Sequence, residues 1–222
     1  MRHVYMTDQS VTNMRHPKWQ RRSEDRPREI CAAALEVFAE KGFAAARLDE
    51  IARRAGVSKG TLYLYFNTKE DLFRAVVRDT VAPNIELLQK ALVAIELPFA
   101  DVVRMFLAQF ADMTSRVPVG AVAKMVIGES RNFPELAKVW HDQIASRALA
   151  MLGGLILKAQ ERGEVREGDP RLHAFSLVGP MLMGVLWRET LQPAGGAPID
   201  LEKLAKQHAE TALAGLLTAT AK

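Results

Sequence analysis

The stretch that decides the fold spans residues 55–66 and reads Ala55-Gly56-Val57-Ser58-Lys59-Gly60-Thr61-Leu62-Tyr63-Leu64-Tyr65-Phe66. Gly56 can adopt the left-handed backbone that a short turn between helices requires. Ser58 is a good N-cap, because its hydroxyl can accept a hydrogen bond from an amide at the start of the next helix. Leu62 and Phe66 are four residues apart and share that helix's inward face. The stretch therefore predicts a helix-turn-helix whose second helix covers residues 59–65.

The outward side of this short helix has side chains that suit nucleic acid. They are Lys59, Thr61, Tyr63 and Tyr65. A helix of this kind can present such residues to a major groove and its flanking phosphates. Gly60 lacks a side chain and allows the DNA to approach the backbone closely. A three-helix packing unit with no DNA-binding role would explain the inward residues but not the outward ones.

The residues on either side of this stretch predict further helices. The first is expected over Pro27 to Lys41, with Gly42 ending it, and the second carries the apolar positions of residues 48–55. After the turn-helix stretch, Thr68-Lys69-Glu70-Asp71 resembles a capping box and predicts the start of a helix over residues 68–81. Lys69 would lie beside free amides that can hold a phosphate. We expect this last helix to couple the head to the rest of the chain.

The charge of the chain is concentrated near its N-terminus. Residues 1–80 hold 15 of the 30 Lys and Arg residues and 11 of the 26 Asp and Glu residues, so the net charge of +4 arises there. Residues 1–24 lack apolar periodicity, and we interpret them as a flexible basic arm. Cys31 is the single cysteine, which fits a reducing cytoplasm. No apolar run approaches the roughly 20 residues that span a membrane.

Four segments of the head together resemble one known family. They are Gly42-Phe43, the run from Ile51 to Tyr63, Tyr65-Phe66, and Lys69-Glu70-Asp71-Leu72. This pattern is similar to that of the tetracycline-repressor (TetR) family. The resemblance implies that Lys59, Thr61 and Tyr63 contact bases or adjacent phosphates, and that Tyr65 and Lys69 contact the DNA backbone.

The chain departs from the family pattern at the start of the second helix. The family usually has hydroxyl residues there, whereas this chain has Ala46 and Arg47. The usual N-cap is therefore not expected, and Arg47 is a candidate phosphate contact instead. The complete predicted DNA-binding set is Arg47, Ser58, Lys59, Gly60, Thr61, Tyr63, Tyr65 and Lys69.

The remainder of the chain also predicts helices, separated by proline and glycine. Residues 99–113 show the 3.6-residue apolar repeat of a helix that lies on a core. The expected fold is all-α, with an N-terminal three-helix helix-turn-helix DNA-binding head over residues 25–73. A larger α-helical ligand-binding and dimerisation domain follows over residues 74–222.

Two late segments are candidates for a dimer interface. Residues 174–187 are apolar on nearly all sides, and Asp169 followed by Pro170 predicts the start of their helix. Pro180 is expected to kink this helix. Residues 201–217 present a second broad apolar face. The family resemblance implies that these helices pair with their symmetry mates, whereas burial within one subunit is the alternative.

A cavity for an effector is the third expectation for this domain. The resemblance places these residues around a central pocket: Phe106, Phe110, Met125, Glu129, Trp140, His141, Ile144, Met183 and Trp187. Small-molecule sites are usually apolar cavities with few polar anchors. For each apolar residue alone, ordinary core packing is the alternative. Residues 126–136 resemble family members that control multidrug efflux, which indicates a lipophilic effector.

These patterns together predict a ligand-responsive transcriptional repressor that acts in the cytoplasm as a homodimer. Its partners would be a palindromic double-stranded DNA operator and a small hydrophobic effector, with no membrane. A regulator without a small-molecule effector, switched by a protein partner or acting as an activator, is the alternative. No enzyme activity, metal or cofactor is predicted, because the five histidines are scattered and no nucleophile lies beside a base.

Overall fold

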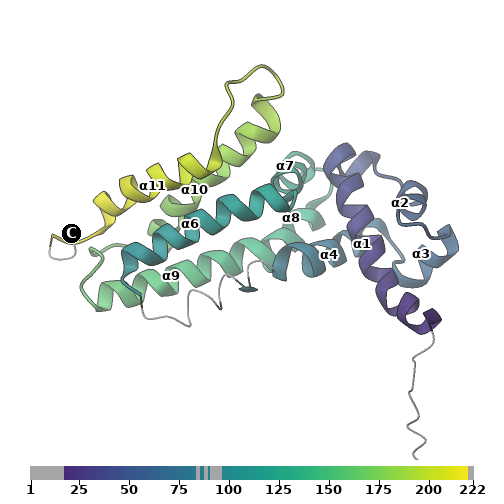
Figure 1. Ribbon diagram of the computed structural model, residues 1–222, viewed down its shortest axis with the longest axis horizontal. Coiled ribbons are helices and arrows are strands. Elements are labelled where there is room, and N and C mark those ends of the chain that lie inside the picture. The colour runs from purple at the N-terminus through teal and green to yellow at the C-terminus, as the bar shows by residue number, and fades with distance from the viewer. Residues whose placement is uncertain (1–17, 84–85, 88–89, 91–96, 220–222) are drawn as a thin grey trace, which may run out of the picture.

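The structure is a computed structural model that describes residues 18–83, 86–87, 90 and 97–219 (Figure 1). Its regular elements are helices, and one isolated β-bridge joins Val165 to Leu217 within the described part of the chain. The all-α prediction is confirmed. The molecule is elongated, with the first four helices at one end and the long later helices at the other. No helix within the described ranges is long and apolar enough to cross a membrane.

The head consists of four helices and a π-helical turn. They are α1 (Lys18–Ala45), α2 (Leu48–Arg54), α3 (Lys59–Tyr65), α4 (Lys69–Val76) and the turn η1 (Val77–Val81). The hydroxyl of Thr68 accepts a hydrogen bond from the Asp71 amide at 3.0 Å. The predicted cap at the start of α4 is therefore confirmed. The helix that we expected to run through to residue 81 changes to π-helical geometry after Val76.

The first helix begins earlier than expected. It starts at Lys18 rather than near Pro27, so residues 18–24 are helical and do not belong to a flexible arm. Apart from Trp19, their sequence is polar and charged, so it has no apolar stripe, and periodicity did not predict this extension. Residues 1–17 of the predicted arm lie outside the described residues. Gly42 has φ 77° and ψ 173°, so the regular helix is interrupted where we expected it to end.

The body consists of longer helices packed side by side. They are α6 (Phe99–Arg116), α7 (Val119–Glu129), α8 (Pro134–Trp140), the π-helical turn η2 (His141–Ala145), α9 (Ser146–Glu161), α10 (Pro170–Leu186), the π-helical turn η3 (Trp187–Leu191) and α11 (Leu201–Leu216). Helix α10 packs against α9 and α11, and α11 packs against α6 (Figure 1). The Asp169 side chain caps α10 through the Arg171 amide, as expected. Helix α10 continues past Pro180 to Leu186.

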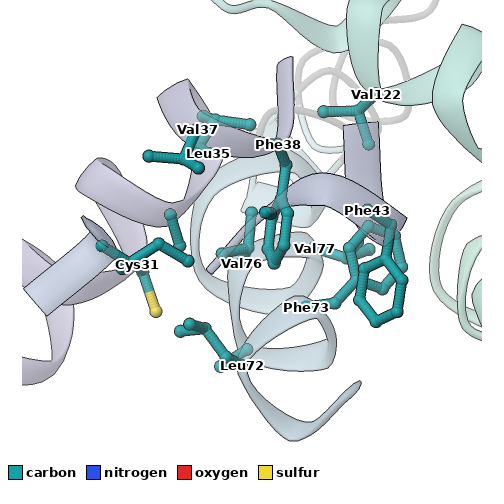
Figure 2. Packing of buried hydrophobic residues seen from close by; sticks show 14 of the residues in the cluster. Cys31, Leu35, Val37, Phe38, Phe43, Leu72, Phe73, Val76, Val77 and Val122 are labelled. Atoms are coloured by element: carbon teal, nitrogen blue, oxygen red, sulfur yellow. The ribbon is translucent and has the colours of Figure 1, made fainter. Parts of the chain in front are cut away.

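The buried apolar residues form two clusters. The first joins the head to α7 and α8, and Figure 2 shows Phe38, Phe43 and Phe73 grouped together with Val122 of α7 nearby. The second cluster lies within the body, between α6, α9, α10 and α11. Because the core of the head includes residues of α7 and α8, burial of apolar surface holds the head against the body.

Candidate functional site

The turn between α2 and α3 has the predicted geometry. Gly56 has φ 66°, and the Val57 amide donates to the Ala52 carbonyl at 2.9 Å. The Ser58 hydroxyl accepts a hydrogen bond from the Thr61 amide at 3.0 Å and caps α3. Leu62 is fully buried, so α3 is fixed by its inward face and presents its other faces to solvent.

The outward face of α3 contains apolar as well as polar groups. Tyr63 and Tyr65 are 43% and 38% exposed, and Leu64 between them is 83% exposed. The Lys59 ammonium lies 6.0 Å from the centroid of the Tyr63 ring. Leu64 was not among the residues predicted to face DNA. The spacing already contained the signal, because a residue midway between the inward Leu62 and Phe66 must point outward.

An acidic residue on α2 accompanies this face. The Lys59 ammonium lies 2.8 Å from the Asp49 carboxylate, and both side chains are about half exposed. Hydrogen bonding from Lys59 holds the pKa of Asp49 below its usual value. The Thr61 and Ser58 hydroxyl oxygens are 2.8 Å apart. The polar groups of this face are thus held in place by partners within the head.

The two outlying DNA-binding candidates have different surroundings. Arg47 is exposed at the N-cap position of α2 and makes no capping hydrogen bond, as expected. The Lys69 ammonium donates to the carbonyls of Phe43, Ala44 and Ala46 at 2.6, 3.1 and 3.1 Å. An ammonium has three donors, and these bonds use all of them. The phosphate contact expected of Lys69 therefore does not fit this geometry, and burial lowers the pKa of Lys69.

A cavity of about 210 Å³ lies among the helices of the body and reaches Val81 at the end of η1. It is lined by Val81, Phe106, Phe110, Met113, Thr114, Val119, Gly120, Ala123, Trp140, Ile144, Ala145, Ala148, Leu149, Phe175, Val178, Gly179, Leu182 and Val185. None of these side chains is charged. The hydroxyl of Thr114 donates to the Ala111 carbonyl at 2.8 Å, so its proton is already used. This lining suits an apolar molecule.

Two family models match the chain. One, described as bacterial regulatory proteins of the tetR family, covers residues 30–76, which lie within the head. The other, described as the C-terminal domain of AefR-like transcriptional repressors, covers residues 101–219, which include nearly all of the body. The chain belongs to the TetR family. It is therefore a DNA-binding transcriptional regulator with a helix-turn-helix head.

Several known proteins are similar to this TetR-family regulator over most of its length. The fatty acid metabolism regulator protein of Bacillus subtilis is 28% identical over 152 residues, 68% of this chain and 77% of that protein. The transcriptional regulator YdeS of the same species is 31% identical over 173 residues, 74% of this chain and 80% of YdeS. The structure of Bacillus subtilis FadR in complex with stearoyl-CoA has a TM-score of 0.71 at 23% identity, covering 85% and 98% of the two chains.

Part of the predicted effector set lines the cavity of this TetR-family regulator. These residues are Phe106, Phe110, Trp140 and Ile144. Met125 and Glu129 do not line this cavity. Met125 is 6% exposed and packs in the cluster that joins head and body. The Glu129 carboxylate accepts hydrogen bonds from the backbone amides of Phe43 and Ala44 instead of facing the cavity.

Three further residues of the predicted effector set also lie outside the lining of this cavity. His141 is exposed, and its Nδ1 lies 2.8 Å from a carboxylate oxygen of Asp142. Met183 is 55% exposed on the outside of α10. The Trp187 indole N–H donates to the Ala197 carbonyl at 2.8 Å. An apolar helix such as α10 has too weak a periodicity to predict which residues face inward. This also explains why Phe175 and Val178 were missed.

The ion pair between Lys59 and Asp49 leads to a first prediction. Asp49→Asn should raise affinity for duplex DNA by about 3–10-fold at low salt, because it removes a negative charge beside the phosphates and frees Lys59. The gain should shrink as the salt concentration rises. Fluorescence anisotropy with a labelled duplex at several salt concentrations measures both effects.

A matched control removes an acidic partner far from the head. Asp101 of α6 pairs with Arg104 at 3.3 Å, and Asp101→Asn makes the same chemical change in the body. This control should leave DNA affinity unchanged within about twofold, since charges beyond a Debye length are screened. Equal affinities for Asp49→Asn and the original protein would show that Asp49 does not lie near bound DNA.

Proposed function

We propose that this TetR-family regulator is a cytoplasmic repressor that binds a palindromic operator as a homodimer and is released by a small lipophilic molecule. The observation that carries this proposal is the uncharged cavity, because α7 lines it and also belongs to the core of the head. A ligand in the cavity then touches an element that positions the DNA-binding helix. The proposal gives the chain no catalytic step and no cofactor.

DNA reading is assigned to the exposed face of α3. In a two-fold dimer, two copies of α3 would enter successive major grooves roughly 34–36 Å apart. Lys59, Thr61 and Tyr63 would contact bases or nearby phosphates, and Tyr65 the backbone. Leu64 would make an apolar contact with a thymine methyl group. Arg47 would hold a phosphate at the start of α2, with Ser58 and Gly60 at the start of α3 close to the backbone.

The dimer interface is assigned mainly to α10. Leu172, Phe175 and Met183 are 65%, 54% and 55% exposed, and their spacing, with Gly179 between them, places them on one face of the helix. Phe175 and Gly179 also border the cavity, so this face runs along the cavity's edge. An exposed apolar stripe of this kind marks an interaction surface. In α11, by contrast, the inward residues such as Ala205 pack within the subunit. We therefore assign the broad apolar face of α11 to packing within one subunit.

The effector is assigned by the chemistry of the cavity. Its walls are aliphatic and aromatic side chains without a charged group, so the buried part of the ligand should be uncharged and apolar. The complex of Bacillus subtilis FadR with stearoyl-CoA supports a ligand with an apolar chain, since that protein has the same fold. The volume of about 210 Å³ favours a small ligand or one that enlarges the cavity.

Selection of random duplex DNA by the purified protein, followed by sequencing, tests the DNA-binding proposal. We expect a palindromic motif whose half-sites lie about one helical turn apart. Binding without any enriched motif that disappears at modest salt would contradict sequence-specific reading. A single half-site motif would contradict the dimer.

Filling the cavity gives the second prediction. Ala123 is 4% exposed on α7 and lines the cavity, so Ala123→Phe places a ring in that space. We expect the variant to bind the neutral fluorophore N-phenyl-1-naphthylamine at least about tenfold more weakly, because the ring occupies the ligand volume. The fluorescence increase on titration measures this. Ala121→Phe on the same helix lies outside the lining and should bind the fluorophore normally.

Operator binding should respond differently from fluorophore binding. Ala123→Phe should keep operator affinity within about threefold, since a ring that fits into the existing empty volume does not displace α7 in the way that a larger ligand would. If Ala123→Phe bound the fluorophore as strongly as the original protein, the cavity would not be the ligand site.

A further inference from the structure

Residues 42–46, which are the end of α1 from its kink at Gly42 together with Ala46, lie where the head meets the body, and we call them the strap. The Phe43 amide donates to Oε1 of Glu129 at 2.8 Å, and the Ala44 amide donates to Oε2 at 2.7 Å. Each carboxylate oxygen thus takes one amide of the strap. Glu129 is the last residue of α7. A side chain of the body therefore binds backbone N–H groups of the strap.

A side chain of the head binds backbone carbonyl groups of the same strap. Lys69, the first residue of α4, donates to the carbonyls of Phe43, Ala44 and Ala46. Its ammonium also lies 4.6 Å from the centroid of the Phe43 ring, close enough for a cation–π interaction. The strap is followed directly by Arg47, the N-cap position of α2. Its position therefore fixes where α2, and with it α3, begins.

Gly42 meets two requirements of this joint. Its φ of 77° lies in the left-handed region that favours glycine. In addition, a Cβ at this position would collide with Oε1 of Glu129. Gly56 and Gly163 also have positive φ, but a Cβ on either would meet no atom within 4 Å. The close approach of a carboxylate is thus particular to Gly42 among these three.

Helix α7 connects this joint to the cavity. Val119, Gly120 and Ala123 near the start of α7 line the cavity, and Glu129 at its end holds the strap. A packed helix shifts largely as one body, because its backbone hydrogen bonds resist internal deformation. Any displacement of α7 by a ligand would therefore move the Glu129 carboxylate relative to the two amides.

We propose that Glu129 is a positioning residue that ties the body to the DNA-reading head through the strap, so that the position of α7 sets the spacing of the two heads in the dimer. The inference rests on the proposed function for its dimer and operator. Glu129 itself contacts neither the DNA nor the ligand. It acts through the backbone of residues 43 and 44.

The substitution series Glu129→Gln and Glu129→Ala tests the joint directly. Glutamine keeps one acceptor oxygen but turns an NH₂ group toward a backbone donor, so one of the two bonds is lost. Amide hydrogen exchange of the free protein should accelerate about tenfold at one of Phe43 and Ala44 in Glu129→Gln, and at both in Glu129→Ala. Unchanged exchange at both amides would overturn the proposal. Glu135→Gln, an exposed carboxylate on α8, is the control for charge alone.

The second readout is binding to a duplex selected from random DNA. Glu129→Ala should lower affinity for the full palindrome about tenfold or more, while affinity for one half-site stays within about twofold, because only simultaneous binding depends on head spacing. Equal losses on both duplexes would mean general damage to the head and would overturn the proposal. Unchanged affinity for the palindrome would overturn it as well. If the original protein selected no palindrome, the proposed function would be wrong. The hydrogen-exchange experiment would still test the contact between Glu129 and the strap.

A double-mutant cycle separates collision from backbone strain. Gly42→Ala adds both, whereas Gly163→Ala, at φ 74° with open space around it, adds strain alone. The midpoint of thermal unfolding should fall more for Gly42→Ala than for Gly163→Ala. The same substitution in the Glu129→Ala background should cost less than in the original protein, because the colliding oxygen is gone and only the backbone strain at Gly42 remains. Equal effects of Gly42→Ala in both backgrounds would contradict the close contact.

Discussion

Replacing Phe43 with alanine should lower the free energy of unfolding by about 3–5 kcal/mol, the usual cost of deleting a buried phenylalanine side chain. Phe43 is fully buried, and its ring centroid lies 5.5, 6.0 and 5.0 Å from those of Phe38, Phe73 and Phe133. Figure 2 shows the rings of Phe38, Phe43 and Phe73 close together. The first two rings belong to the head, and Phe133 precedes α8 of the body. The substitution thus removes packing at the junction between the two parts.

Chemical denaturation followed by circular dichroism measures this loss, at one fixed protein concentration because a dimer's stability depends on it. Ile127→Ala is the matched control, since Ile127 is 56% exposed on α7. That control should change the free energy of unfolding by no more than about 0.5 kcal/mol. A loss for Phe43→Ala no larger than for the control would show that the ring cluster does not join head to body.

The features that the sequence predicted well depend on neighbours in the chain. Ser58 caps α3 through an amide three residues away, Thr68 does the same for α4, and Asp169 caps α10. The left-handed Gly56 is likewise a property of one residue in a short turn. These interactions need no information about the rest of the fold, so a motif is sufficient to predict them.

The site residues that were mispredicted depend on distant partners. Lys69 binds carbonyls 23 to 26 residues earlier in the chain, and Glu129 binds amides 85 and 86 residues earlier. Their charges suggested a phosphate and a ligand, but backbone groups that only folding brings near use those charges. The position of Met183 outside the cavity lining was unpredictable for another reason. The periodicity of α10 is too weak to predict which apolar residues face the cavity and which face outward.

Met183→Glu should abolish the dimer and lower affinity for the palindromic operator by at least about 100-fold. Met183 is 55% exposed, lies outside the cavity lining and belongs to the apolar stripe of α10. In a two-fold interface each substitution places two carboxylates in one contact, where they would be desolvated without a partner. The fold of the single subunit should survive, because the side chain already faces solvent there.

Analytical ultracentrifugation at micromolar concentration measures the oligomeric state, and anisotropy with palindromic and half-site duplexes measures binding. Ile127→Glu introduces the same charge at a similarly exposed apolar position on α7 and should leave the dimer intact. Half-site affinity of Met183→Glu should stay within about threefold, because each head is unchanged and only the linkage between two heads is lost. A Met183→Glu protein that remained dimeric would exclude α10 as the interface. The two heads would then have to be related through a different face, and the spacing of half-sites selected from random DNA would have to be explained from that face.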